Sequence, residues 1–227
     1  MTASSKRVLM AGKAEVVLAL HLVTRHRAAR LTALAAAAAT GVAAVPGNDQ
    51  ASRALILAAV GTLAAVAASR PLAAGAPFLS ARVAVATWRV VFVGRLIGAL
   101  LPVLVVAGLA VVTRPVFGRA LDLALLFATA TYGCVLAAVV MGLTPRLGAS
   151  AATMVGLVCA GVGLLALAPD VAPQSGAGGF AWYVLPLSWR ALDALNGGGV
   201  ADIAFLALWA LLGALLVAGA LHTKEVP

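Results

Sequence analysis

Charge is scarce in this sequence of 227 residues. Only 10% of the residues are charged and 63% are hydrophobic, whereas a soluble domain carries about 25% charged and about 45–50% apolar residues. A water-soluble core has no room for so much apolar surface, so lipid must solvate most of the chain. The composition excludes an ordinary soluble domain and predicts an all-α integral membrane protein.

Acidic residues are rarer still, which leaves a net charge of +9. The basic residues stand between apolar runs, as the orientation rule for membrane proteins predicts. We therefore exclude nucleic acid as a partner and expect the acidic headgroups of membrane lipids as the counter-charge. The only two cysteines, Cys134 and Cys159, fall within apolar runs. This placement favours buried free thiols over a disulfide.

Ionisable residues are missing from the middle of every apolar run, and the chain has no G-x-x-x-x-G-K-[ST] loop. Carriers coupled to protons or sodium usually keep ionisable groups or broken helices at mid-membrane. Energy for uphill transport would therefore enter from outside the membrane, with ATP bound by a partner chain. We expect no catalytic residue, cofactor or metal site in this chain.

Six apolar runs of about membrane-spanning length divide the chain. We place the spans at 31–46, 54–74, 96–113, 120–143, 149–168 and 202–222. Residues 1–30 are predicted to form a cytoplasmic tail, with a membrane-surface helix over 13–30, and 223–227 a second tail. Six spans put both termini on one side, which then holds twelve basic residues against four on the other. This ratio predicts a multi-pass plasma-membrane protein with both termini in the cytoplasm.

A basic junction leads into the third span. Arg82 and Arg89 are seven residues apart, so they would share one face of a helix, and Trp88 suits a membrane interface. The junction is either a cytoplasmic helix that a partner pushes on or an ordinary loop that obeys the charge rule. Gly94 and Gly98 follow as a G-x-x-x-G pattern, which permits close approach of another helix.

A polar segment, 169–200, precedes the last span and is expected at the outer surface. Trp182, Tyr183 and Trp189 form an aromatic cluster there, and a short helix is predicted over 189–195. The segment is therefore a re-entrant or interfacial element. It is either a gate over an exit path or a connector that lies in the membrane.

The order of these parts resembles the permease subunit of the type-2 ABC-transporter family. That family has an N-terminal surface helix, six spans, a cytoplasmic coupling helix between spans two and three, and re-entrant helices before span six. The matching stretches are FLSARVAVATWRVVFVGRLIGALLP (78–102) and YVLPLSWRALDAL (183–195). The layout covers nearly the whole chain.

The resemblance implies a mechanism and a set of residue roles. Two such subunits, identical or different, would pair above two separate ABC ATPase subunits. ATP-driven closure of the ATPases would push the 77–90 helix and export an amphipathic or lipid-like substrate, such as a drug, a lipid or a peptide antibiotic. The implied roles are ATPase docking by Phe78, Arg82, Trp88 and Arg89, a span-three joint at Gly94, Arg95 and Gly98, and an outer gate at Trp182, Tyr183, Pro186, Trp189 and Arg190.

Two other functions stay open. The chain could be a non-transporting membrane scaffold that assembles through its Gly/Ala faces and has no ATPase partner. An intramembrane serine hydrolase would use Ser150 and His222, which fall at the cytoplasmic ends of their spans. Nothing in the sequence orients that histidine.

Overall fold

The structure is a computed structural model that describes residues 3–45, 47–72, 88–162, 185, 186, 191 and 200–222. These residues are helical apart from short turns and contain no strand, which confirms the all-α class. The elements are α1 (Ala3–Arg25), α2 (Arg27–Ala44), α3 (Asp49–Ala68), α5 (Trp88–Thr113), the 3-10 helix η1 (Pro115–Phe117), α6 (Leu123–Leu147), α7 (Ala149–Val162) and α10 (Val200–His222). Four helices, namely α3, α5, α6 and α10, are long and apolar enough to cross a membrane.

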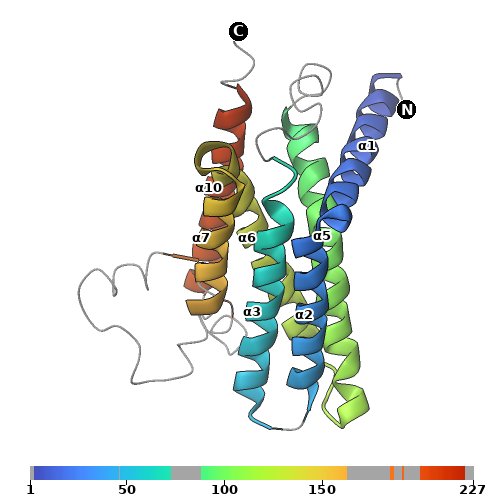
Figure 1. The fold of residues 1–227 in the computed structure, drawn as a ribbon, viewed down its shortest axis with the longest axis vertical. Helices are drawn as coiled ribbons and strands as arrows, with labels where there is room; N and C mark the ends of the chain where they lie inside the picture. Colours follow the sequence, from blue (N-terminus) through green and yellow to red (C-terminus); the bar gives the residue numbers. More distant parts are fainter. Residues whose placement is uncertain are drawn as a thin grey trace, which may run out of the picture.

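The helices form one upright bundle (Figure 1). α1 begins and α10 ends at the same end of it, which we call the terminal end. The opposite end, which we call the far end, holds the turn between α2 and α3 and the short helix η1. Successive helices from α2 onward alternate in direction between these two ends.

α1 and α2 follow one another along α5. α1 accompanies the half of α5 nearest the terminal end, and α2 accompanies the other half (Figure 1). The chain bends between them at His26, whose backbone is extended at φ −78° and ψ 121°. The sequence predicted a surface helix over 13–30 and a span starting at 31. The break falls at His26 instead, because a bend there lets both helices pack on α5.

α3 and α5 both begin earlier than the predicted spans. Asn48 caps α3, and its Oδ1 accepts hydrogen bonds from the backbone N–H groups of Gln50 (3.0 Å) and Ala51 (3.3 Å). This cap satisfies two of the free donors at the helix start. α5 begins at Trp88, so the last residues of the predicted 77–90 helix belong to α5. The preceding segment, 73–87, lies outside the described residues.

α6 runs past residue 143, where the sequence analysis placed the end of the fourth span. Pro145 lies in its last turn, and the helix ends at Gly148, whose φ of 84° favours glycine. The Gly148 N–H donates to the Thr144 carbonyl at 3.0 Å. Proline removes only one helical hydrogen bond. The packing of α6 against four other helices outweighs this loss.

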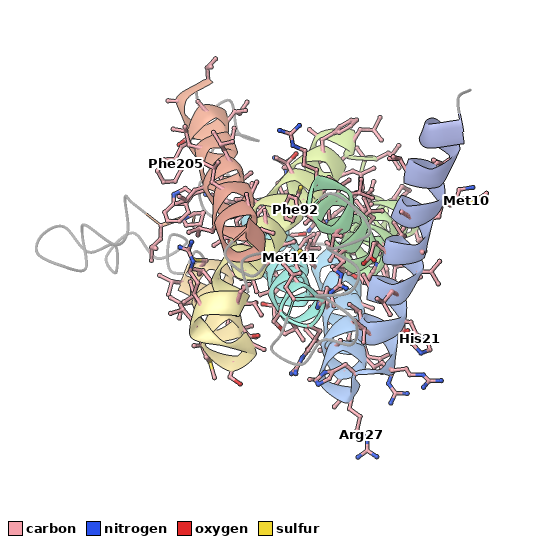
Figure 2. The ribbon with its side chains drawn as sticks, turned by 90° about the horizontal axis from the view of Figure 1, so that it is seen from above. Met10, His21, Arg27, Phe92, Met141 and Phe205 are labelled. Carbon is pink, nitrogen blue, oxygen red and sulfur yellow. The ribbon has the colours of Figure 1, made fainter. Side chains whose placement is uncertain are left out.

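Small residues bring the helices of the bundle close together. A Cβ added to Gly213 would lie 2.5 Å from the Ala138 backbone, and one added to Gly156 would lie 2.5 Å from Ala65 Cβ. Glycine therefore permits the α10–α6 and α7–α3 contacts. In Figure 2, Phe92 and Met141 lie within the bundle, and both are buried.

Candidate functional site at the joint of α1 and α5

Two glycines of α5 let α1 approach closely. A Cβ added to Gly94 would lie 2.6 Å from Glu15 Cβ, and one added to Gly98 would lie 2.6 Å from the Val16 carbonyl oxygen. Side chains do not tolerate such distances, so these two positions require glycine. The partner of the predicted G-x-x-x-G pattern is therefore the N-terminal helix of the same chain.

The joint encloses a buried ion pair. Arg95 Nε donates to Glu15 Oε2 at 2.9 Å, and the two side chains are 0% and 2% exposed. Burying either charge alone would cost on the order of several kcal/mol. The two side chains must therefore enter the joint together, and the pair fixes which face of α1 meets α5.

Arg95 also reaches the end of α3. Its Nη1 donates to the Pro71 carbonyl. The described chain stops one residue later, at Leu72, and resumes at Trp88. One guanidinium therefore ties α1, the end of α3 and the start of α5 together, and it joins the two flanks of the 73–87 segment.

The structure places Gly94, Arg95 and Gly98 together against α1, a partner that the sequence did not predict. Glu15 is the only acid among the first 30 residues, and it lies within an apolar stretch. An isolated acid in such surroundings was the available signal for a buried partner. The identity of that partner was not readable, because Arg95 is 80 residues away.

The predicted ATPase-docking residues are only partly described. Arg89 is exposed in the first turn of α5. Trp88 opens that helix, and its side chain lies outside the described residues, as do Phe78 and Arg82. The docking assignment therefore stays a prediction.

The predicted outer gate falls almost wholly outside the described residues. Trp182, Tyr183, Trp189 and Arg190 belong to that part, and Pro186 alone is described, as a buried residue. The gate also stays a prediction.

His26 lies at the bend between α1 and α2. Burial, followed by the charge of Arg70, lowers the pKa of the His26 imidazole. Its Nδ1 is buried and has no hydrogen-bond partner in the described part of the chain. His26 therefore stays neutral near pH 7, and the folded chain takes up a proton there less readily than the unfolded chain.

The far end carries a network of arginines and aspartates around Asp49. The Asp49 carboxylate lies 3.0 Å from Arg53 Nε, 2.7 Å from Arg114 Nη2 and 2.6 Å from Arg119 Nη1. Arg53 Nη2 also lies 3.0 Å from Asp122 Oδ2. These residues line an open depression of about 580 Å³. The network ties the starts of α3 and α6 to the end of α5.

Two hydroxyl groups inside the bundle form hydrogen bonds to backbone carbonyls of the same chain. Tyr132 Oη donates to the Cys159 carbonyl at 3.1 Å, and Thr129 Oγ1 donates back to the Leu125 carbonyl at 2.8 Å. Cys159 is buried, Cys134 is half-buried, and both are free thiols. The Tyr132 and Thr129 hydroxyls are therefore already paired within the chain, and the residues around them are mostly apolar.

A mostly apolar cavity of about 380 Å³ opens between α6 and α10 toward the far end. Phe127 and Thr131 line it from α6, and Ile203 and Leu206 line it from α10. Its lining suits an apolar part of a small molecule.

Catalytic and metal chemistry find little support in the described residues. Ser150 is exposed in the first turn of α7, and His222 ends α10 with its side chain outside the described part. No group of three His, Cys, Asp or Glu side chains that could hold a metal lies together in that part.

Comparison of the chain with family models, curated proteins and solved structures finds no match.

Proposed function

We propose that the chain is the membrane permease subunit of an ATP-driven exporter, powered by separate ABC ATPase subunits. The observation that carries this proposal is the contact of Arg95 with both Glu15 and the Pro71 carbonyl. The contact joins the two flanks of 73–87, the segment that contains most of the coupling helix that the family resemblance places at 77–90. A force on that segment would pass through one guanidinium to α1, α3 and α5.

The alternating directions of α2, α3, α5, α6, α7 and α10 (Figure 1) support six membrane crossings. Only four of the six meet the length and composition of a span within the described residues. α2 starts with Arg27 and Arg30, and the described part of α7 has 14 residues. The common end of α1 and α10, with its excess of basic residues, supports cytoplasmic termini in a plasma membrane.

The cargo of this exporter is amphipathic or lipid-like. The Thr129 and Tyr132 hydroxyls are paired within the chain, and the cavity between α6 and α10 is mostly apolar. An apolar lining selects substrates that bury hydrocarbon or aromatic surface. We assign no ATP site to this chain, and a second permease subunit would complete the pathway.

Co-purification with an ATPase tests the proposal. The tagged chain is extracted from its native membrane in mild detergent, and co-purifying proteins are quantified. We expect a stoichiometric ATPase with a P-loop, and Arg89→Glu should reduce its recovery about tenfold or more, because exposed charges steer and hold such contacts. Arg27→Glu is the matched control, since Arg27 is exposed at the start of α2 and points away from the bundle (Figure 2).

Two results would count against the proposal. One is recovery of the chain without any ATPase. The other is equal recovery of the ATPase with wild type, Arg89→Glu and Arg27→Glu, which would remove the docking role of the 77–90 segment. A size-exclusion profile like that of wild type establishes that each variant is folded.

The scaffold alternative receives less support. Gly94, Gly98, Gly142, Gly156 and Gly213 all face other helices of the same chain at distances that exclude a Cβ. These faces are therefore occupied within one chain and do not serve assembly with another protein.

A further inference from the structure

An apolar groove follows the α1–α5 joint on its exposed side. Its volume is about 660 Å³, within the range of about 300–1,000 Å³ of small-molecule pockets. Aliphatic side chains from both helices line it, among them Val17, Val93 and Ile97. Lys13 and Arg89 also line it, and none of its described lining residues is acidic.

The two walls of the groove run in the same direction. Gly12 lies opposite Val90, Glu15 lies opposite Gly94, and farther along Ala19 lies opposite Gly98. The paired numbers rise together, so α1 and α5 are parallel, as Figure 1 also shows.

The parallel register places a cationic stretch ahead of an apolar end along the groove. Lys13 and Arg89 lie nearer the terminal end than Val17, Val93 and Ile97. From Arg89 to Ile97 the wall is about 12 Å long, at about 1.5 Å per helical residue. After Val8 and Leu9 of the α1 wall, the groove therefore offers two cations and then hydrocarbon-like surface beyond them.

The apolar end of the groove continues onto a surface that lipid must cover. α5 is long and apolar enough to span a membrane. Beyond Ile97 it exposes large aliphatic side chains, including Leu101, Val105 and Val112. A hydrocarbon chain that entered the groove would therefore lie continuous with the acyl chains around α5.

We propose that this groove binds one anionic phospholipid from the leaflet at the terminal end of the bundle. Its phosphate lies at Lys13 and Arg89, and one acyl chain lies along Val17, Val93 and Ile97. This inference depends on the chain lying in a membrane and is independent of the permease proposal. It assigns α1 a function beyond packing, because the lipid bridges α1 and α5 next to the ion pair.

Charge argues for this occupant over a second copy of the chain. In a two-fold dimer the same patch meets itself. Lys13 and Arg89 would then face their own copies, and like charges repel strongly where water is excluded. An anionic headgroup neutralises both cations, whereas a zwitterionic headgroup brings no net charge.

Competition between two lipids tests the proposal. The full-length chain in detergent is mixed with equal amounts of palmitoyl-oleoyl phosphatidylglycerol and palmitoyl-oleoyl phosphatidylcholine, and retained lipid is measured by native mass spectrometry. We expect one phosphatidylglycerol to be retained in preference. Lys13→Glu should lower this preference about tenfold, the value of one charge-assisted contact. Val93→Trp should reduce retention of both lipids by filling the groove.

Matched controls separate the site from general effects. Arg27→Glu removes the same charge from an exposed position at the start of α2, and Val105→Trp adds the same bulk to an exposed position of α5 outside the groove. Both controls should keep the preference of the wild type. If Lys13→Glu does not fold, Lys13→Gln makes the same comparison with a smaller expected loss.

Three results would overturn the proposal. They are equal retention of the two lipids by the wild type, an unchanged preference in both Lys13 variants, and unchanged retention in Val93→Trp. A dimer without retained lipid that Val93→Trp separates into monomers would also overturn it, and would assign the groove to a second copy.

Discussion

The two ends of the bundle handle charge in opposite ways. At the terminal end, Glu15 and Arg95 form a pair that is almost completely buried. At the far end, Asp49 is 48% exposed and shares its carboxylate among three arginines. Loss of one partner of the buried pair strongly destabilises the fold, because the other charge stays in an apolar site. The far-end network is redundant, and solvent and salt reach its half-exposed Asp49 carboxylate. A single charge substitution should therefore destabilise the terminal end strongly and the far end only slightly.

Arg95→Met should have the largest effect. It leaves the Glu15 carboxylate buried without its cation and removes the contact with the Pro71 carbonyl. The expected loss is about 3–5 kcal/mol of unfolding free energy, which lowers Tm by about 10 °C. The measurement is thermal unfolding in detergent followed by intrinsic fluorescence.

The double variant Glu15→Leu/Arg95→Met is the control for that loss. Removing both charges leaves an apolar contact, so much of the stability should return. A double variant no more stable than Arg95→Met would contradict the account of the buried pair.

Gly98→Ala should have the next largest effect. Its Cβ would lie 2.6 Å from the Val16 carbonyl oxygen and from Ala19 Cβ, so α1 must move away from α5. Overpacking of this kind costs about 1–3 kcal/mol. Gly108→Ala on the same helix is the matched control, because nothing lies within 4 Å of its added Cβ. Equal Tm values for the two variants would show that the joint is not tightly packed.

Arg119→Gln at the far end should have a smaller effect. Arg119 pairs with Asp49 at 2.6 Å and donates to the Val45 carbonyl at 2.9 Å. An ion pair with a half-exposed carboxylate contributes about 1 kcal/mol or less. The difference in Tm from wild type should shrink in 1 M NaCl, where the screening length is about 3 Å. The corresponding difference for Arg95→Met should not shrink, and parallel salt dependence of the two variants would remove the contrast between the ends.

The pH dependence of stability should show the smallest effect, at His26. Its pKa is lowered in the folded chain by burial and by Arg70. As the pH falls through the ordinary histidine value of about 6.5, the unfolded chain takes up the proton first, so folded stability decreases. His26→Gln should remove part of the decrease in Tm between pH 7.5 and pH 5.5. His21→Gln, at an exposed position of α1, is the control and should leave the decrease unchanged.

The sequence predicted the features that depend on local composition. The helical class and the long apolar runs were readable, because a bilayer demands about 20 apolar residues in a row. The G-x-x-x-G pattern predicted that another helix approaches closely at Gly94 and Gly98, but it did not predict which helix. Nothing local marks α1 as that partner.

The features that the sequence did not predict depend on contacts between distant residues. No proline or glycine marks the bend at His26 in the sequence. The bend follows from the packing of α1 and α2 on α5. The link of Arg114 and Arg119 to Asp49, 65 and 70 residues earlier, was not predicted. Only the folded bundle brings these groups together.

The composition of the native complex tests the permease proposal most directly. Mild detergent extraction followed by native mass spectrometry would give the mass and the subunits of the released assembly. The account predicts two permease chains, at least one of them this chain, together with two P-loop ATPase subunits. An assembly that contains copies of this chain and no ATPase would contradict it.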